Sequence, residues 1–537
     1  MESARELVEH HGGPVRIQFW GTRGSIATPG PSTSRYGGNT SCIEVRSARG
    51  TLVVIDCGTG GHALARKLIS CDDKGRRGNI LISHTHWDHI QGIPFFDPLF
   101  VCGNEWDIYG PRGLRESLHE ALAGQMQYMY FPVSLDQCGA NIRYHDLVEG
   151  SFAIGDIRVS ARYSNHPVLT LGYRLQVDGA TLVYACDHEP HSRMLSLGDG
   201  KITGEDLRHA EFMEGADLLI HDAQYTAEEY PEKIGWGHSP VEYVLKLAAH
   251  ARVKRVALTH HDPRRDDDAI ERLVASIRQT SSVDVFAAFE GHVAELKMRP
   301  ERGALPSSGE VADMPAEGKL AEPVVLLGIA QTRTSAAVCE ALQAESICAR
   351  SLESMDAVHI SIAKNGPALA ILEHNPPRID GIELCRAIRR QAPEHQLPVL
   401  IVADREDQDV GAMAGVSDWL IEPFTAAYAR TKIRTWLLRT ARKSIKSAIH
   451  AEEERPSHPL RVVHAAHGLG GHGIKKLPRV SQRAADGNDP VISSEKAALL
   501  WMYGRQIAAF DTPTFSNKVG QIIAQATSKA QASSRYR

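Results

Sequence analysis

One short run of residues constrains this chain more than any other feature. The run HTHWDH (residues 84–89) directly follows the apolar run NILIS, which has the pattern of a β-strand. It therefore lies on the loop at a strand's C-terminal end, where His84 and His86 can converge on one point and Asp88 and His89 on a second. Four ligating side chains in six residues can hold two cations. The alternative interpretation is a polar loop that carries histidines by chance.

The region around this run is typical of a layered α/β domain. Short apolar runs alternate with turns, and helical stretches appear later in the same region. Strands are expected at 15–20, 42–47, 51–57, 79–84, 157–164, 173–177, 181–186, 217–223 and 255–260. Helices are expected at 113–123, 205–214, 240–251 and 267–279.

Composition divides the 537 residues into several segments, as the length alone predicts. A Pro-, Gly-, Ser- and Glu-rich stretch is typical of a linker, and the region after it shows five strand–helix repeats, which predict a doubly wound parallel sheet. Two helical patterns near the end, at 494–510 and 514–530, are expected to dock together and to have no catalytic role. The expected organisation is a tail (1–13), a first domain (14–298), a linker (299–322), a second domain (323–441) and a flexible segment with C-terminal helices (442–537).

Charge and composition exclude several classes of protein. The formal net charge of -5 lacks the basic excess of a protein that lives on nucleic acid. The charged N-terminus has no apolar core, so no signal peptide is expected, and no stretch is long and apolar enough to span a membrane. Nine cysteines without a CxxC pair indicate reduced thiols and a cytoplasmic protein.

The HTHWDH run and the residues that follow it resemble the metallo-β-lactamase superfamily over about residues 14–298. The resemblance implies an αββα sandwich and two divalent cations, expected to be zinc, with manganese or iron as alternatives. It implies that His84, His86 and His166 bind one cation, that Asp88, His89 and His260 bind the other, that Asp187 bridges both, and that Asp56 supports the metal loop. His261 is the competing choice for the last ligand.

Two further resemblances narrow the branch of the superfamily. β-Lactamases with this motif generally carry a non-acidic residue at the position of Asp187, so an acid there points to the phosphodiesterase and glyoxalase II branches. The segments 219–226 and 235–249 resemble ribonuclease Z, in which an acid orients a histidine that stabilises or protonates the reacting phosphate. Asp222 and His238 match these positions, and a carboxylate can fix an imidazole tautomer in this way.

These features favour a phosphodiesterase in which a hydroxide shared by two cations attacks a small phosphodiester. The long basic arm of ribonuclease Z has no counterpart here, which with the net charge argues against a large folded RNA. Cyclic nucleotides are the leading class, although no residue is seen to select a base. The alternatives are a thioester hydrolase like glyoxalase II and a non-catalytic nucleotide-binding scaffold. The segment Gly37-Gly38-Asn39 could bind phosphate, but a tight turn is the preferred interpretation.

Residues 323–441 resemble the receiver domain of response regulators, most clearly in 379–390, 398–404 and 418–424. Receivers accept phosphate on an Asp beside an acidic pair that binds Mg²⁺, a Ser or Thr, and a Lys. The matching positions here are Glu373, then Ile329 and Ala330, then Ala403 and Glu422. Too few oxygen ligands remain for Mg²⁺. We expect a receiver-like domain that takes no phosphate and serves docking, regulation or dimerisation, with a signalling protein or a second copy as its partner.

Overall fold

The computed structural model of this chain describes residues 14–70, 76–114, 116–196, 200–297, 323–329, 333–352, 366–376 and 378–453. Several predictions lie outside these residues: the N-terminal tail, the linker, the two helical patterns of the C-terminal segment, and Ala330. In the part of the chain that is described, no helix is long and apolar enough to cross a membrane.

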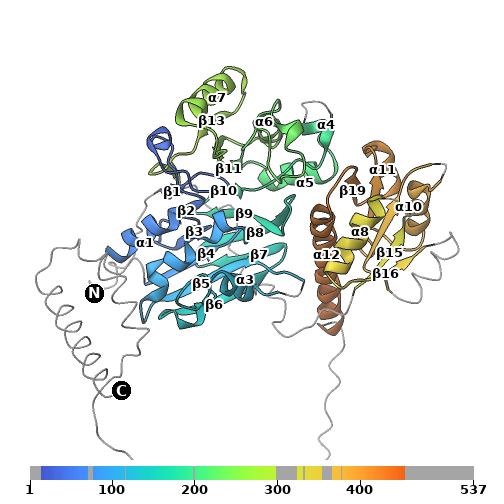
Figure 1. Cartoon of the computed structure of the whole chain (residues 1–537), viewed down its shortest axis with the longest axis horizontal. Helices are drawn as coiled ribbons and strands as arrows, with labels where there is room; N and C mark the ends of the chain where they lie inside the picture. Colours follow the sequence, from blue (N-terminus) through green and yellow to red (C-terminus); the bar gives the residue numbers. More distant parts are fainter. Residues whose placement is uncertain are drawn as a thin grey trace, which may run out of the picture. The chain divides into compact units, whose positions relative to one another are not determined.

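The N-terminal domain contains two seven-stranded sheets (Figure 1). The first has the order β14 (Val293–Leu296), β1 (Val15–Gly21), β2 (Cys42–Arg46), β3 (Leu52–Ile55), β4 (Arg77–Leu81), β5 (Glu105–Pro111), β6 (Asn141–Leu147). The second has the order β13 (Asp284–Ala287), β12 (Arg255–Thr259), β11 (Leu218–Asp222), β10 (Ala180–Ala185), β9 (Thr170–Val177), β8 (Ile157–Ser164), β7 (Gly150–Ile154). Strands β3 to β6 run parallel to one another, as do β10 to β13, so their C-terminal ends share an edge in each sheet.

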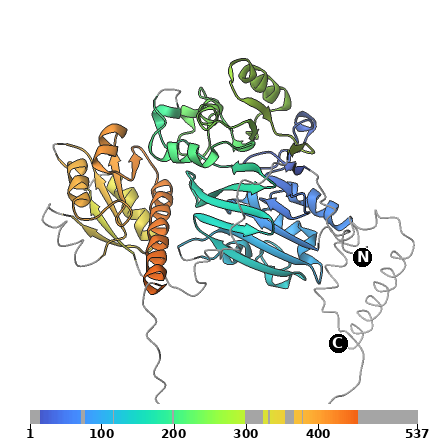
Figure 2. The ribbon, with the colours of Figure 1, turned by 180° about the vertical axis from the view of Figure 1, so that it is seen from behind.

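The two sheets pack face to face and helices cover both outer surfaces. The core between the sheets includes Phe19, Val159 and Tyr173, all fully buried. On the outer face of the first sheet, α1 (Gly60–Ser70) and α3 (Leu118–Gln125) bury their apolar sides. On the second, α5 (Gly204–Met213) and α6 (Val241–His250) do the same, as can be followed from both sides in Figures 1 and 2. This is the αββα sandwich that the sequence predicts.

The remaining helices of this domain are short, apart from one. They are α2 (Trp87–Ile90), α4 (Arg193–Ser196), α7 (Asp267–Thr280) and the 3₁₀ turns η1 (Pro31–Thr33), η2 (Ile93–Phe95), η3 (Asp97–Phe100), η4 (Leu135–Gln137) and η5 (Tyr230–Glu232). The helix expected at 113–123 begins only at Leu118, because Ser117 and Glu120 form a capping box that fixes its start.

Strands β5, β6, β7, β13 and β14 were not expected from the sequence. Strand β6 shows why, since its side chains are mostly exposed or half-buried and it carries charged residues where an apolar face would be sought. It ends the first sheet, and an edge strand needs less apolar surface than a central one.

The second domain is a five-stranded parallel sheet. Its order is β16 (Cys348–Ser351), β15 (Val324–Gly328), β17 (Leu369–Glu373), β18 (Val399–Ala403), β19 (Asp418–Ile421), the doubly wound 2-1-3-4-5 arrangement of receivers. Helices α8 (Arg333–Ala344) and α12 (Ala426–Glu453) cover one face, and α10 (Gly381–Arg389) and α11 (Gln408–Ala414) cover the other. Helix α12 continues past residue 441 into the segment expected to be flexible.

Candidate metal centre

The predicted site residues meet where strands of both sheets end. Asp56 and His84 follow β3 and β4 of the first sheet, and Asp187 and His260 follow β10 and β12 of the second. Three of them have left-handed backbones, with φ of 56° at Asp56, 56° at Asp187 and 58° at His260. Such conformations cost about 1–3 kcal/mol each in residues other than glycine and cluster at functional sites. The strand ends therefore turn sharply to bring these side chains together.

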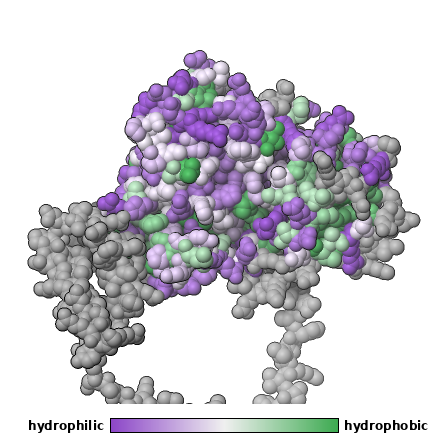
Figure 3. Space-filling view, in the orientation of Figure 1, coloured by the Kyte–Doolittle hydropathy of each residue, from purple (hydrophilic) through white to green (hydrophobic). Residues whose placement is uncertain are grey.

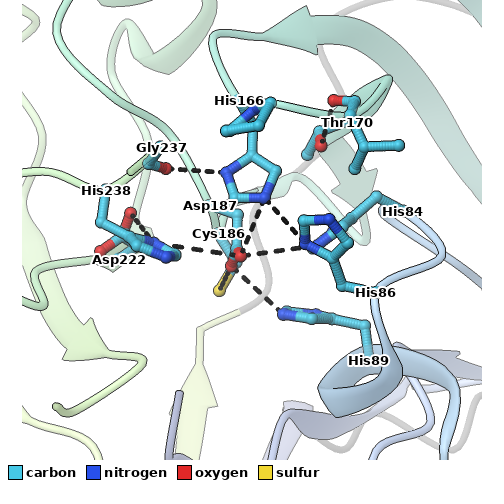
Figure 4. Close-up of polar contacts among 12 residues, drawn as sticks. His84, His86, His89, His166, Thr170, Cys186, Asp187, Asp222, Gly237 and His238 are labelled. Atoms are coloured by element: carbon cyan, nitrogen blue, oxygen red, sulfur yellow. Dashed lines mark hydrogen bonds and ion pairs between the residues drawn. The ribbon is translucent and has the colours of Figure 1, made fainter. Parts of the chain in front are cut away.

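The first group of candidate ligands consists of His84, His86, His166 and Asp187, whose ligand atoms all lie within 4.8 Å of one another (Figure 4). His166 Nε2 lies 3.0 Å from His86 Nδ1, and His84 Nε2 lies 3.5 Å from Asp187 Oδ2. Of the four side chains only His86 is exposed, so the group opens to solvent on its side.

The second group consists of His89, Cys186, Asp187 and His260, again within 4.8 Å. Asp187 Oδ1 lies 3.3 Å from Nε2 of both His89 and His260, while Asp187 Oδ2 faces the first group. Asp88 Oδ2 is 3.1 Å from His260 Nε2 and 3.4 Å from His89 Nε2. The one carboxylate of Asp187 thus presents an oxygen to each group.

Most of the imidazoles are held from behind by their second nitrogen. His89 Nδ1–H donates to Asp56 Oδ2 at 2.8 Å, and His166 Nδ1–H donates to the carbonyl oxygen of Gly237 at 2.8 Å. His260 and His84 make the corresponding contacts with Gln224 Oε1 at 3.2 Å and Ser83 Oγ at 3.1 Å. With Nδ1 protonated, each Nε2 turns a lone pair toward the cluster, which is the usual arrangement behind metal-bound histidines.

These donor atoms fit divalent cations. His84 Nε2 is buried without a hydrogen-bond partner, an expensive state for a polar atom that a cation would relieve. Burial lowers the pKa of His166 to about 3, so this ring stays neutral and able to ligate at pH 7. Imidazoles and carboxylates in two groups that share Asp187 match a dinuclear site.

His238 lies beside the second group, on the loop before α6. Its Nδ1 is 3.3 Å from Asp222 Oδ2, and its ring stacks on His260 at 4.8 Å. Asp222 is itself fixed, because its carboxylate accepts the backbone N–H groups of His188, Ser239 and Gln224. Burial opposes the charged form of the ring, but the carboxylates of Asp222, Asp187 and Asp88 together raise the pKa of His238 to about 9. Asp222, His238 and His260 also have ligand atoms within 4.8 Å, so His238 lies in range of a cation as well.

Several residues of the site had no individual signal in the sequence analysis. Cys186 donates its Sγ–H to Asp187 Oδ1 at 3.0 Å, and only its place beside Asp187 could have indicated it. The backbone N–H of Ser25 donates to Asp88 Oδ2 at 2.7 Å. The buried Glu189 carboxylate accepts the hydroxyl of Tyr230 and two backbone N–H groups of the loop that carries His238.

The structure places the residues of two alternatives that the sequence left open: His260 or His261 as the last ligand, and phosphate binding or a tight turn at residues 37–39. His260 points into the cluster, whereas His261 Nε2–H donates to the carbonyl oxygen of Ala288 at 2.8 Å. In the segment before β2, the Gly37 N–H donates to the carbonyl oxygen of Thr33, and the backbone N–H and side-chain amide of Asn39 donate to the carboxylate of Glu290.

Two packed mixed sheets with a histidine and aspartate cluster at their strand ends define an α/β metallohydrolase. Residues 51–261 match the family model described as the Beta-lactamase superfamily domain. This match, within the N-terminal domain, agrees with the resemblance of the HTHWDH motif to the metallo-β-lactamase superfamily.

Curated relatives and solved structures are each similar to a part of this chain. A Ribonuclease BN of Cronobacter sakazakii is 24% identical over 306 residues, covering 49% of this chain and 93% of the relative. A Ribonuclease Z of Bacillus cereus is 23% identical over 308 residues, covering 50% of this chain and 95% of the relative. The metallo-β-lactamase fold protein YhfI of Bacillus subtilis is 19% identical over 52% of this chain and 100% of its own, with a TM-score of 0.39. A putative response regulator of Chloroflexus aurantiacus is 24% identical and covers 22% of this chain and 98% of its own, with a TM-score of 0.20.

Proposed function

We propose that the N-terminal domain is a metal-dependent phosphodiesterase acting on a small phosphodiester, with cyclic nucleotides as the leading class. One observation carries the proposal: the His238 ring, held by Asp222, lies next to two groups of metal-ligating side chains. A metal centre alone suits many hydrolyses, but an adjacent imidazole with a raised pKa suits a reaction whose leaving oxygen needs a proton. The relatives named as ribonucleases support a phosphodiester substrate.

Each residue then has a separate role. His84, His86 and His166 would hold one cation, Asp88, His89 and His260 the other, and Asp187 would serve both. Two such cations would supply a water of lowered pKa and neutralise charge on the phosphate. His238 would donate a proton to the leaving oxygen, and Asp222 keeps its ring oriented. Asp56 orients His89 and, through Ser83, the ring of His84.

The test is a metal analysis followed by a substrate screen. Zinc, manganese and iron per chain are measured in the purified full-length protein, which is then offered bis(p-nitrophenyl) phosphate, cyclic nucleotides and S-lactoylglutathione. Hydrolysis of the phosphodiesters is expected. Activity on the thioester alone would replace the proposal with a glyoxalase II-like function. Metal-loaded protein inert on all three would favour the non-catalytic scaffold.

RNA belongs in the same screen. The sequence argument against a large folded RNA gains no support from the comparisons, because the relatives are named Ribonuclease BN and Ribonuclease Z. A structured RNA cleaved faster than every small phosphodiester would overturn the small-substrate part of the proposal and leave the phosphodiesterase part standing.

We also propose that the receiver-like domain takes no phosphate and acts by docking on the hydrolase domain. Glu373 ends β17 and is buried, and Ala403 ends β18, where receivers need an Asp and a Ser or Thr. The Arg193 guanidinium on α4 donates to the backbone carbonyl oxygens of residues 421, 422 and 423, at 2.8 to 3.0 Å. Labelling of the full chain with acetyl phosphate and Mg²⁺ tests the first part, and a phosphorylated Glu373 or neighbouring Asp would overturn it.

A further inference from the structure

Three exposed apolar residues stand one or two positions in the sequence from residues that belong to the candidate metal centre or contact it. Trp87 is 71% exposed, Ile26 is 61% exposed and Trp236 is 54% exposed. Figure 3 shows a mainly hydrophilic surface with scattered hydrophobic patches on the face toward the viewer. Large apolar side chains left in water beside a candidate active site are therefore a feature that needs an explanation.

Trp87 belongs to the metal motif itself. It stands between His86 and Asp88 and is the first residue of α2, where its carbonyl oxygen accepts the Gln91 N–H at 2.7 Å. His86 is the exposed member of the first group of ligands. His86 and Trp87 are therefore two consecutive exposed residues at the start of α2.

Trp236 stands on a loop that is fixed to the same centre. The next residue, Gly237, accepts the Nδ1–H of His166 through its carbonyl oxygen at 2.8 Å. The Glu189 carboxylate accepts the backbone N–H groups of Gly235 at 2.6 Å and Gly237 at 2.9 Å, on both sides of Trp236. Lys233 Nζ lies 4.4 Å from the centre of the indole ring. This tryptophan is thus held at a defined position and not at a loose loop tip.

Exposed indoles thus stand beside residues of the centre in the sequence, Trp87 next to His86 and Trp236 two residues before His238. Of the possible occupants, a phosphodiester that carries a nucleobase has the matching chemistry, an anion for the cations and a flat ring for the indoles. Stacking of a base on an aromatic side chain contributes about 1–3 kcal/mol per base.

We propose that Trp87 and Trp236 form a base-stacking subsite of the metal centre, so that the substrate is a phosphodiester bearing a nucleobase. The inference rests on the proposed phosphodiesterase function and names its substrate class. Ile26 is also exposed near the centre in the sequence, since the backbone N–H of its neighbour Ser25 donates to Asp88 Oδ2.

The experiment compares two substrates that differ only in their bases: a dinucleoside monophosphate and its abasic analogue, cleaved by the metal-loaded full chain. We expect kcat/KM to favour the dinucleotide by about 5- to 150-fold, the factor that about 1–3 kcal/mol of stacking supplies. Trp87→Ala and Trp236→Ala should lower kcat/KM for the dinucleotide and leave the abasic analogue unchanged. Trp87→Phe should retain the preference. Met413→Ala, in the exposed part of α11, is the control for loss of an exposed apolar side chain.

Equal kcat/KM for the two substrates in the wild-type protein would overturn the subsite, and so would tryptophan variants that slow both substrates alike. If these side chains instead receive a protein segment, the first outcome is expected, because no base would stack on them. If neither substrate is hydrolysed, the proposed function fails. The base-stacking subsite is then tested separately, by measuring ligand binding. Calorimetry on the metal-loaded protein should then show tighter binding of AMP than of ribose 5-phosphate, and equal Kd values would overturn it.

Discussion

The imidazole of His166 donates its Nδ1–H to the carbonyl oxygen of Gly237, 2.8 Å away and 71 positions later in the chain. The contact requires glycine at residue 237 for two reasons. Its φ is +88°, and a Cβ atom there would lie 2.2 Å from His166 Nδ1. The backbone of this loop can approach the His166 ring only because residue 237 has no side chain.

Gly237→Ala should therefore displace His166 and weaken metal binding by about 10- to 100-fold, the usual effect of losing a contact behind a metal ligand. Gly235→Ala is a matched control, since it has φ +86° on the same loop but open space around its Cβ position. Metal titration of both variants checks the prediction. If the two variants bind metal with equal affinity, the loss would come from backbone strain in the loop and not from a clash with His166.

Asp187→Asn should remove metal and activity together. The substitution keeps the size of the side chain but removes the charge that faces both groups of histidines. We expect at least about a 100-fold loss of kcat/KM and fewer than two cations per chain, measured by elemental analysis. Asp136→Asn is the control, because that carboxylate is 78% exposed and pairs only with His119 among the described residues. Turnover at the wild-type rate in Asp187→Asn would contradict the assigned role.

His238→Ala should lower kcat by about 10²- to 10⁴-fold with metal content unchanged, as expected for loss of a proton donor. The control is His119→Ala, a surface histidine outside the site. The metal analysis decides between two roles, because His238 also lies in ligand range with Asp222 and His260. A variant that loses a cation would assign His238 to the metal and remove it as the proton donor.

Asp206 on α5 predicts a pH dependence of stability. Burial raises the pKa of Asp206 from 3.8 to about 6, although its carboxylate accepts hydrogen bonds from the Tyr243 hydroxyl and two backbone N–H groups. Because the folded-state pKa is above the unfolded value, the stabilisation is complete below about pH 4 and is lost as the pH rises through about 6. The difference corresponds to about 3 kcal/mol.

Asp206→Asn should flatten this part of the pH profile. Urea midpoints between about pH 4 and 7, compared with those of Asp284→Asn, a carboxylate 66% exposed, measure the effect. If the urea midpoint of Asp206→Asn changes with pH as steeply as that of the wild-type protein, another group is responsible for the pH dependence.

The sequence predicted the parts of the site that follow local patterns. The HTHWDH run stands out by density, and His166, Asp187 and His260 each follow an apolar strand, so a family motif could be matched to them. Glu189 and Gln224 could not be found in this way. Their contacts join residues 36 to 48 positions apart, and such pairings depend on the packed loops and not on any local spacing.

The same limit applies to the fold. Central strands such as β10 and β11 are buried almost throughout and contain apolar runs, and they were predicted. Strands β6 and β7, at the edge of each sheet, carry several exposed side chains and were missed. The doubly wound second domain was predicted because strands such as β17 and β18 are buried on both faces and contain continuous apolar runs.

The division of the ligands between the two sheets has a consequence for folding. His84, His86 and His89 come from the first sheet, while His166, Asp187 and His260 come from the second. Neither sheet alone carries a complete group, so a cation binds only the assembled sandwich and shifts the folding equilibrium toward it. In this sense a bound cation is a non-covalent cross-link between the two halves of the domain, and chelation should loosen their packing before it melts either sheet.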